Sequence, residues 1–211
     1  MEMKGLTLQV EDGNDIEIDG DVKFSLSKII VKGTGNKIKI GSSLNITGLI
    51  INLKGDNKEI IIGPSKKNIS NLKIVSIRGR DQRVLIGKNF GCGGCEIQMN
   101  DGKEVVIVGE DCLFSWGIKI RTSDGHSVVD LDTGRAINLP EDVSIGNHVW
   151  VGEDARFLKG SIVPDNCIVG SASVITRAFT ASNCVIAGFP AKVVKENVTW
   201  DRRMPYEYNS G

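Results

Sequence analysis

The chain contains only two histidines, His126 and His148. His126 lies in the polar, turn-rich stretch 123–127, just before an irregular segment that runs to Pro140. A neutral imidazole can take the proton from a hydroxyl nucleophile, so His126 is a candidate general base, and a surface histidine without a role is the alternative. Because a three-histidine zinc site needs more imidazoles than the chain supplies, we expect no catalytic metal.

His148 and Trp150 flank Val149 in a short strand pattern. Side chains alternate along a strand, so both are expected to point away from the side that buries Val149. An outward tryptophan indicates contact with a ligand or with another subunit. The alternative to a role in the site is that Trp150 only fills an interface between subunits. We interpret His148 more simply as an outward structural residue.

Three cations near the C-terminal end, Lys159, Arg177 and Lys192, also fall at outward positions beside glycine-rich turns. Together with backbone N–H groups they could hold the phosphates of a cofactor, and solvated surface charge is the alternative. Cys92 and Cys95 form a lone CxxC pair, which is weak evidence for zinc and lacks the context of a thioredoxin motif. We interpret this pair as structural.

A six-residue period dominates the second half of the chain and must position these side chains. Stepping by six from residue 145 meets apolar residues nine times in succession: Ile145, Val151, Phe157, Val163, Val169, Ile175, Ala181, Ala187 and Val193. Neither a 3.6-residue helix nor an alternating strand gives this period. It is typical of hexapeptide repeats, in which each repeat is a flat strand plus a turn and three repeats make a triangular coil.

The first half repeats at a longer interval, with strand-like blocks that end at Gly41, Gly63, Gly87 and Gly109. We expect these blocks to be coils of the same solenoid, enlarged by short insertions at one corner.

The expected architecture is therefore all-β, with a single β-helix domain over 1–195. Its coils are irregular over about 1–110, a catalytic loop spans about 121–140, and regular hexapeptide coils span 145–195. Residues 196–211 lose the period and are expected to form a short tail or cap.

Composition excludes several other classes of protein. Lys and Arg number 26 against 26 Asp and Glu, so the chain lacks the basic excess that nucleic-acid binding needs. No apolar run approaches the length of a membrane span, and no signal peptide is recognisable. Five cysteines without framework spacing favour a reducing, cytoplasmic location.

Three stretches, 123–127, 145–152 and 187–195, together resemble the hexapeptide-repeat acyltransferases of the left-handed β-helix fold. The resemblance is closest to the branch that O-acetylates bacterial capsular and other surface polysaccharides. It is specific over roughly 105–200 and only architectural before that.

This resemblance implies a left-handed coil, a homotrimer with active sites between subunits, and acetyl-CoA as co-substrate. His126 matches the general base of the family, and Trp150 matches the aromatic residue at the acetyl site. The positions that match the lining of the pantetheine and nucleotide arm are Lys159, Ser171, Ala172, Arg177, Pro190 and Lys192.

The expected function is acetyl-CoA-dependent O-acetylation of a sugar hydroxyl, in a capsular or other surface polysaccharide. His126 would take the hydroxyl proton, and backbone N–H groups near the Trp150 turn would stabilise charge on the thioester oxygen, with no covalent acetyl-enzyme. The alternatives are an N-acetyltransferase of an amino sugar nucleotide and a non-catalytic β-helix scaffold or binding module.

Overall fold

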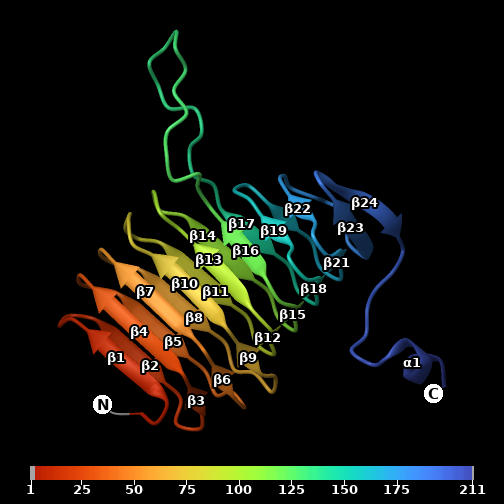
Figure 1. Ribbon diagram of the computed structural model, residues 1–211, viewed down its shortest axis with the longest axis horizontal. Helices are drawn as coiled ribbons and strands as arrows, with labels where there is room; N and C mark the ends of the chain where they lie inside the picture. The colour runs from red at the N-terminus through yellow and green to blue at the C-terminus, as the bar shows by residue number, and fades with distance from the viewer. Residues whose placement is uncertain (1–2, 211) are drawn as a thin grey trace.

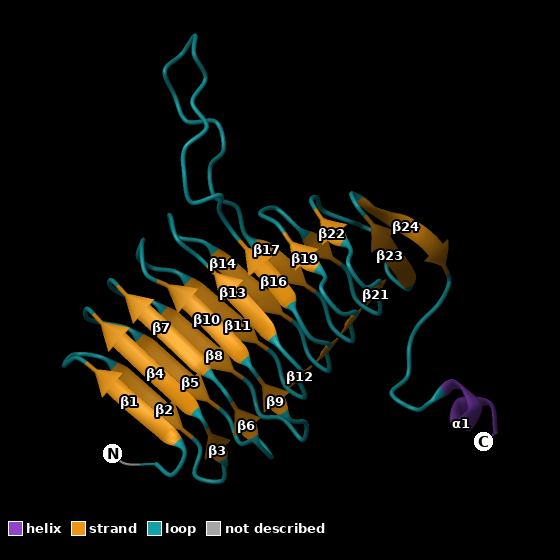
Figure 2. Cartoon of the chain, in the orientation of Figure 1, coloured by secondary structure: helices purple, strands orange, loops and turns teal. Residues whose placement is uncertain are grey.

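Short strands separated by turns wind the chain into a prism with three flat sides (Figures 1 and 2). The computed structural model describes residues 3–210; residues 1–2 and 211, the outer ends of the expected domain and tail, lie outside it. Successive strands pass in turn to a first, a second and a third sheet, which we call sheets A, B and C. The predicted all-β parallel solenoid is confirmed.

Sheet A has eight strands, all parallel: β1 (Leu6–Val10), β4 (Ser27–Lys32), β7 (Ile50–Lys54), β10 (Leu72–Ser76), β13 (Cys95–Gln98), β16 (Ile118–Arg121), β19 (Arg156–Phe157) and β22 (Val174–Ile175). Sheet B has seven: β2 (Asp15–Ile18), β5 (Lys37–Ile40), β8 (Glu59–Ile62), β11 (Arg83–Ile86), β14 (Val105–Val108), β17 (Val143–Ile145) and β20 (Ile162–Val163). Sheet C has nine: β3 (Phe24–Ser25), β6 (Ile46–Thr47), β9 (Ile69–Ser70), β12 (Gly91–Cys92), β15 (Leu113–Phe114), β18 (Trp150–Val151), β21 (Ile168–Val169), β23 (Cys184–Gly188) and β24 (Ala191–Glu196), of which β24 pairs antiparallel with β23.

The inward side chains of the three sheets form one continuous apolar core. The first six residues of the six-residue series, from Ile145 to Ile175, are all fully buried in it. The last three are not: Ala181, Ala187 and Val193 are only partly buried, and β23 instead buries Cys184 and Ile186. The segment 176–183 between β22 and β23 shifts the register, so the predicted period ends one coil earlier than expected.

A column of glycines follows the edge between sheets B and C, where each coil passes directly over the next. A Cβ added to Gly87 would lie 2.7 Å from the carbonyl carbon of Gly109, and one on Gly109 would lie 2.6 Å from that of Gly146. Such distances are too short for any side chain, so the repeated Gly of the first half is required by the close stacking of coils.

A column of buried polar residues follows another edge of the prism, between sheets A and B. Lys58 donates from Nζ to Ser76 O at 2.8 Å and to Arg78 O at 3.0 Å, and burial lowers its pKa to about 8. Higher in the column, the buried carboxylate of Glu104 accepts hydrogen bonds from the side chains of Gln82 and, at 3.3 Å, Thr122. These hydrogen bonds stabilise the edge at which the expected catalytic loop leaves the solenoid.

Two segments leave the solenoid. Residues 122–142, between β16 and β17, stand out from the edge between sheets A and B as a long finger (Figure 1). Beyond β24 the chain turns back along the side of sheet C and ends in α1 (Pro205–Ser210), so the expected tail lies along a side of the prism. Within residues 3–210, no helix is both long and apolar enough to cross a bilayer.

Candidate functional site

The finger that carries His126 is braced at its base by three side chains. Asn138, on the returning limb, donates from Nδ2 to the carboxylate of Asp124 and to the carbonyl of His126, both at 2.8 Å. Its Oδ1 accepts a hydrogen bond from Val128 N at 2.7 Å, which ties the two limbs together. Lys159, from the next coil, closes an ion pair with Asp124 at 2.6 Å.

The bracing fixes the charge on Asp124. The hydrogen bond from Lys159, followed by the one from Asn138, lowers the pKa of the Asp124 carboxyl below its ordinary value. The carboxylate therefore stays ionised, and the brace stays closed, throughout the neutral range.

The imidazole of His126 is exposed beside this brace and makes no hydrogen bond within residues 3–210. It lines a hollow of about 250 Å³ between the finger and the coils below, together with Arg78, Asp101 and Asn138. An imidazole held by its backbone but free at both ring nitrogens is available to an incoming hydroxyl.

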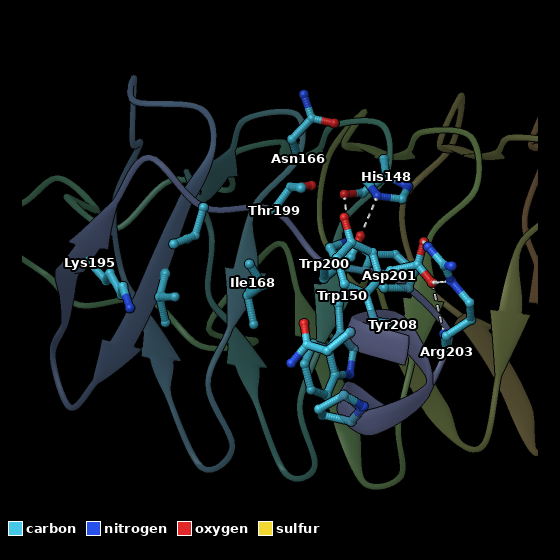
Figure 3. Close-up of a pocket in the computed structure, with 14 residues that line it drawn as sticks. His148, Trp150, Asn166, Ile168, Lys195, Thr199, Trp200, Asp201, Arg203 and Tyr208 are labelled. Carbon is cyan, nitrogen blue, oxygen red and sulfur yellow. Dashed lines mark hydrogen bonds and ion pairs between the residues drawn. The ribbon is translucent and has the colours of Figure 1, made fainter. Parts of the chain in front are cut away.

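Trp150 projects outward from the middle of sheet C, as predicted. In register it lies between Leu113 of β15 and Ile168 of β21, and its side chain is 42% exposed. It lines a pocket of about 700 Å³ between sheet C and the tail. Figure 3 shows Trp150, Trp200 and Tyr208 gathered at one end of this pocket and Lys195 at the other.

His148 is held at both ring nitrogens. Nδ1 lies 2.8 Å from Asp111 Oδ2, Nε2 lies 3.1 Å from the Trp200 carbonyl oxygen, and the ring stacks on the Trp200 indole at 4.4 Å. Asp111 also accepts a hydrogen bond from Arg202 Nη2 at 3.0 Å. Partial burial alone would raise the pKa of Asp111, but the hydrogen bonds from His148 and Arg202 outweigh it and lower that pKa.

Sequence reasoning missed Asp111, Trp200 and Arg202. Trp200 lies 52 positions after His148 in the sequence, and the tail that carries it has no period from which its path could be predicted. The Trp–Asp–Arg–Arg composition of the tail was the only available signal.

The expected oxyanion donors near the Trp150 turn are already in use. The backbone N–H of His148 donates to Glu110 O, that of Trp150 to Cys167 O, and that of Gly152 to Val169 O. These groups are committed to the ladder between coils, so the expectation that they face the thioester oxygen is wrong for these three. The indole Nε1–H of Trp150 has no partner within residues 3–210 and remains free to donate.

The expected cofactor residues fall on two edges of the prism. Ser171 and Ala172, between β21 and β22, and Pro190, between β23 and β24, lie at the edge between sheets C and A, and Lys192 on β24 lies beside it. Lys159 and Arg177 lie one coil apart at the edge between sheets A and B, near the finger. The expected row of three cations is therefore not continuous in one chain, and the Lys159 ammonium is taken by Asp124.

His126 and Trp150 are also separated. The finger leaves at the edge between sheets A and B, which is opposite sheet C. The hollow that His126 lines shares no residue with the pocket of about 700 Å³ that Trp150 lines. One chain by itself does not bring the two residues together.

Comparisons with known proteins identify the family. No protein-family model matches the chain. A polysialic acid O-acetyltransferase of Neisseria meningitidis is 37% identical over 191 residues, which cover 90% of this chain and 87% of the relative. A polysialic acid O-acetyltransferase of Escherichia coli O1:K1 / APEC is 32% identical over 61% of this chain and 41% of its own length.

Two solved structures share the fold along nearly the whole chain. The polySia-specific acetyltransferase NeuO matches with a TM-score of 0.83 at 26% identity, over 99% of both chains. The polysialic acid O-acetyltransferase OatWY matches with a TM-score of 0.57 at 28% identity, over 97% of both. The chain thus belongs to the family of hexapeptide-repeat acetyltransferases that includes these proteins, and it is a polysaccharide O-acetyltransferase.

Proposed function

We propose that the protein transfers the acetyl group of acetyl-CoA to a hydroxyl of polysialic acid in a bacterial capsule. The similarity to the Neisseria meningitidis enzyme, which extends over 90% of the chain, carries this proposal. The amino sugar alternative has no comparable support, because the relative is a polysialic acid O-acetyltransferase by name.

His126 is the general base in this proposal. It takes the proton of the sugar hydroxyl while that oxygen forms a bond to the acetyl carbonyl carbon. The C–S bond of the thioester then breaks, and His126 returns the proton to the CoA thiolate, so that no acetyl-enzyme is formed. The free ring nitrogens of His126, against the two engaged nitrogens of His148, support this assignment.

Trp150 marks the acetyl site. Its exposed indole would pack against the acetyl group, and its free N–H could donate to the oxygen on which negative charge develops. The committed backbone groups around it leave the indole as the donor that Trp150 itself can offer.

We infer a homotrimer, because the site is incomplete in one chain. His126 and Trp150 lie on opposite parts of the prism, whereas a neighbouring copy can bring its finger to the sheet C of another. The finger carries apolar side chains that the described residues of one chain leave exposed: Val128, Val129, Leu131, Ile137 and Leu139. Leu131 is 96% exposed, and this supports the proposal that a second copy covers the finger.

The same assembly would complete the cofactor site. Ser171, Ala172, Pro190 and Lys192 form one side, and Arg177 lies near the finger, so two copies each supply one edge of the groove for acetyl-CoA. We assign Lys159 to bracing the finger through Asp124, in place of the contact with CoA that the resemblance implies.

A cytoplasmic location is part of the proposal. The sequence supports it, because the five cysteines lack the spacing of a disulfide framework. Secreted proteins use such frameworks, whereas proteins of reducing compartments keep their cysteines as thiols.

The test is acetyl transfer from isotope-labelled acetyl-CoA to purified polysialic acid, followed by mass spectrometry of the polymer. We expect O-acetylated sialic acid residues with the wild type and none above background with His126→Ala. Transfer to an amino sugar nucleotide but not to polysialic acid would contradict the proposal.

A further inference from the structure

A second hollow lies on sheet C, on the N-terminal side of Trp150. Along the outward row of this sheet, Trp150 is in register with Leu113, and Leu113 with Gly91. The next outward position, directly after the end of β12, is also a glycine, Gly93. Because neither glycine carries a side chain, β12 leaves a gap of about 500 Å³ where its neighbours in the row fill the surface.

Two indoles border this hollow. Trp150 closes its C-terminal side, and Trp116, in the turn after β15, is 62% exposed. A Cβ on Gly93 would stand 2.9 Å from Trp116 Nε1, so the glycine is what allows the indole to lie over β12. Flat, amphipathic aromatic faces of this kind suit the apolar face of a sugar ring.

Two cations reach the hollow as well. Arg202 is tied through Nη2 to Asp111, and its Nη1 lies 3.7 Å from the position of a Cβ on Gly91. Lys67 also lines the hollow and has no ion pair within residues 3–210. The carboxylate of Asp111 neutralises one of these two positive charges, so one positive charge remains to pair with an anionic group of a ligand.

The Cys92–Cys95 motif gains an explanation from this arrangement. Both thiols point into the core, and burial raises the pKa of the Cys92 thiol to about 12, so neither is poised for redox or metal chemistry. Gly93, which lies between the two cysteines, instead faces outward and forms part of the floor of the hollow.

We propose that this hollow binds one acidic sugar of the acceptor, with its ring against Trp116 and its carboxylate towards Lys67 and Arg202. The volume is within the usual range of small-molecule sites and accommodates a single sugar. The proposal rests on the proposed function, since it assumes an acidic polysaccharide as acceptor.

The position of the hollow agrees with the chemistry. Trp150 separates it from the pocket of about 700 Å³ that extends towards Ile168 and Lys195. The expected cofactor residues Ser171, Ala172 and Pro190 also follow Trp150 along the axis of the solenoid, at the edge between sheets C and A. An acceptor sugar on one side of Trp150 and acetyl-CoA on the other would meet at the indole that marks the acetyl site.

Filling the hollow tests the proposal without disturbing the fold. In Gly91→Leu the new Cβ would meet its nearest atoms at 3.4 Å or more, which is ordinary contact. We expect the KM for polysialic acid to rise at least about tenfold, and that for acetyl-CoA to change less than about twofold. Gly20→Leu, at a position with no atom within 4 Å, is the matched control.

Trp116 provides a second variant that is independent of packing at Gly91. Trp116→Ala should raise the acceptor KM by a similar factor, and Trp116→Phe should recover most of the loss because it keeps an aromatic face. Wild-type acceptor KM values in both Gly91→Leu and Trp116→Ala would overturn the proposal.

Calorimetric titration with polysialic acid, without acetyl-CoA, separates this proposal from the proposed function. A wild type that binds the polymer but transfers no acetyl group would overturn the proposed function alone, provided that Gly91→Leu weakens the binding. A wild type that binds no polymer would overturn the acceptor site.

Discussion

The finger over residues 122–142 and the tail after β24 are the two excursions from the solenoid, and each carries or covers one of the two histidines. The finger leaves an edge, is braced at its base, and exposes His126. The tail turns back onto sheet C, buries Trp200 to 7% exposure, and locks His148 between that indole and Asp111.

The difference shows how similar side chains acquire different roles. An imidazole with both nitrogens hydrogen-bonded and its face stacked contributes to the stability of the fold. It is a poor general base, because taking up or releasing a proton would disrupt those contacts. An imidazole whose backbone is fixed and whose ring is free can move a proton without such a loss. The two histidines should therefore separate activity from stability when each is replaced.

The largest effect is expected for His126→Ala. Loss of a general base should lower turnover about 10²–10⁴-fold, while acetyl-CoA binding and the free energy of unfolding remain near the wild-type values. The limb of the wild-type pH–rate profile in the neutral range should disappear in the variant, because it reports the general base. Steady-state kinetics across pH, with denaturant unfolding in parallel, measure both quantities.

A His126→Ala enzyme with near-normal turnover would break the comparison, since the finger would then carry no catalytic group. An equal loss of turnover in His148→Ala would also contradict the comparison, because His148 would then contribute to catalysis as much as His126.

The solenoid and the departure of the finger were predictable from sequence, and the contacts made by the tail were not. Ile145, Val151 and Phe157 must face inward wherever the coil repeats, so the period records their burial directly. The interruption around His126 is visible for the same reason. The stacking of Trp200 on His148 depends on the path of an aperiodic segment, which no local pattern encodes.

The division of the cofactor residues also escaped sequence reasoning. Lys159 and Arg177 are one coil apart and share an edge, but the shift of register before β23 places Lys192 beside another edge. If the six-residue period is extended past the register shift at 176–183, it therefore predicts a row of three cations that the chain does not form.

A smaller effect, on stability, is expected for His148→Ala. Removing a ring that bonds at both nitrogens and stacks on Trp200 should lower the free energy of unfolding by about 2 kcal/mol. Turnover per folded molecule should fall far less than in His126→Ala. Chemical denaturation gives the first quantity, and active-site-normalised kinetics give the second.

Unchanged stability in His148→Ala would show that the tail is held by other contacts. Arg202→Ala, which keeps the stack and removes the ion pair with Asp111, is the variant that then identifies them.

The smallest effect is expected at the brace of the finger. Lys159→Met keeps the aliphatic stem and removes the ion pair with Asp124, an exposed pair worth up to about 1 kcal/mol, so turnover should fall roughly fivefold. The KM for acetyl-CoA should stay the same. A raised KM for acetyl-CoA with unchanged turnover would return Lys159 to the cofactor site.

The pH dependence of the brace distinguishes it from the base. The pKa of Asp124 is lowered, so the contribution of the ion pair is fully present above the ordinary carboxyl range and is lost only as pH falls through the lowered value. Lys159→Met should therefore leave the neutral limb of the pH–rate profile in place, whereas His126→Ala should remove it. A neutral limb that shifts in Lys159→Met would contradict this separation.

Subunit complementation tests the central claim most directly, namely that His126 of one copy works beside Trp150 of another. His126→Ala and Trp150→Ala enzymes should each be nearly inactive when expressed alone. Co-expressed in equal amounts and assembled at random, they should recover roughly a quarter of the wild-type sites, because one kind of contact between copies then carries both native residues. Mixed assemblies that stay as inactive as the two parents would contradict the account and place the whole site within a single chain.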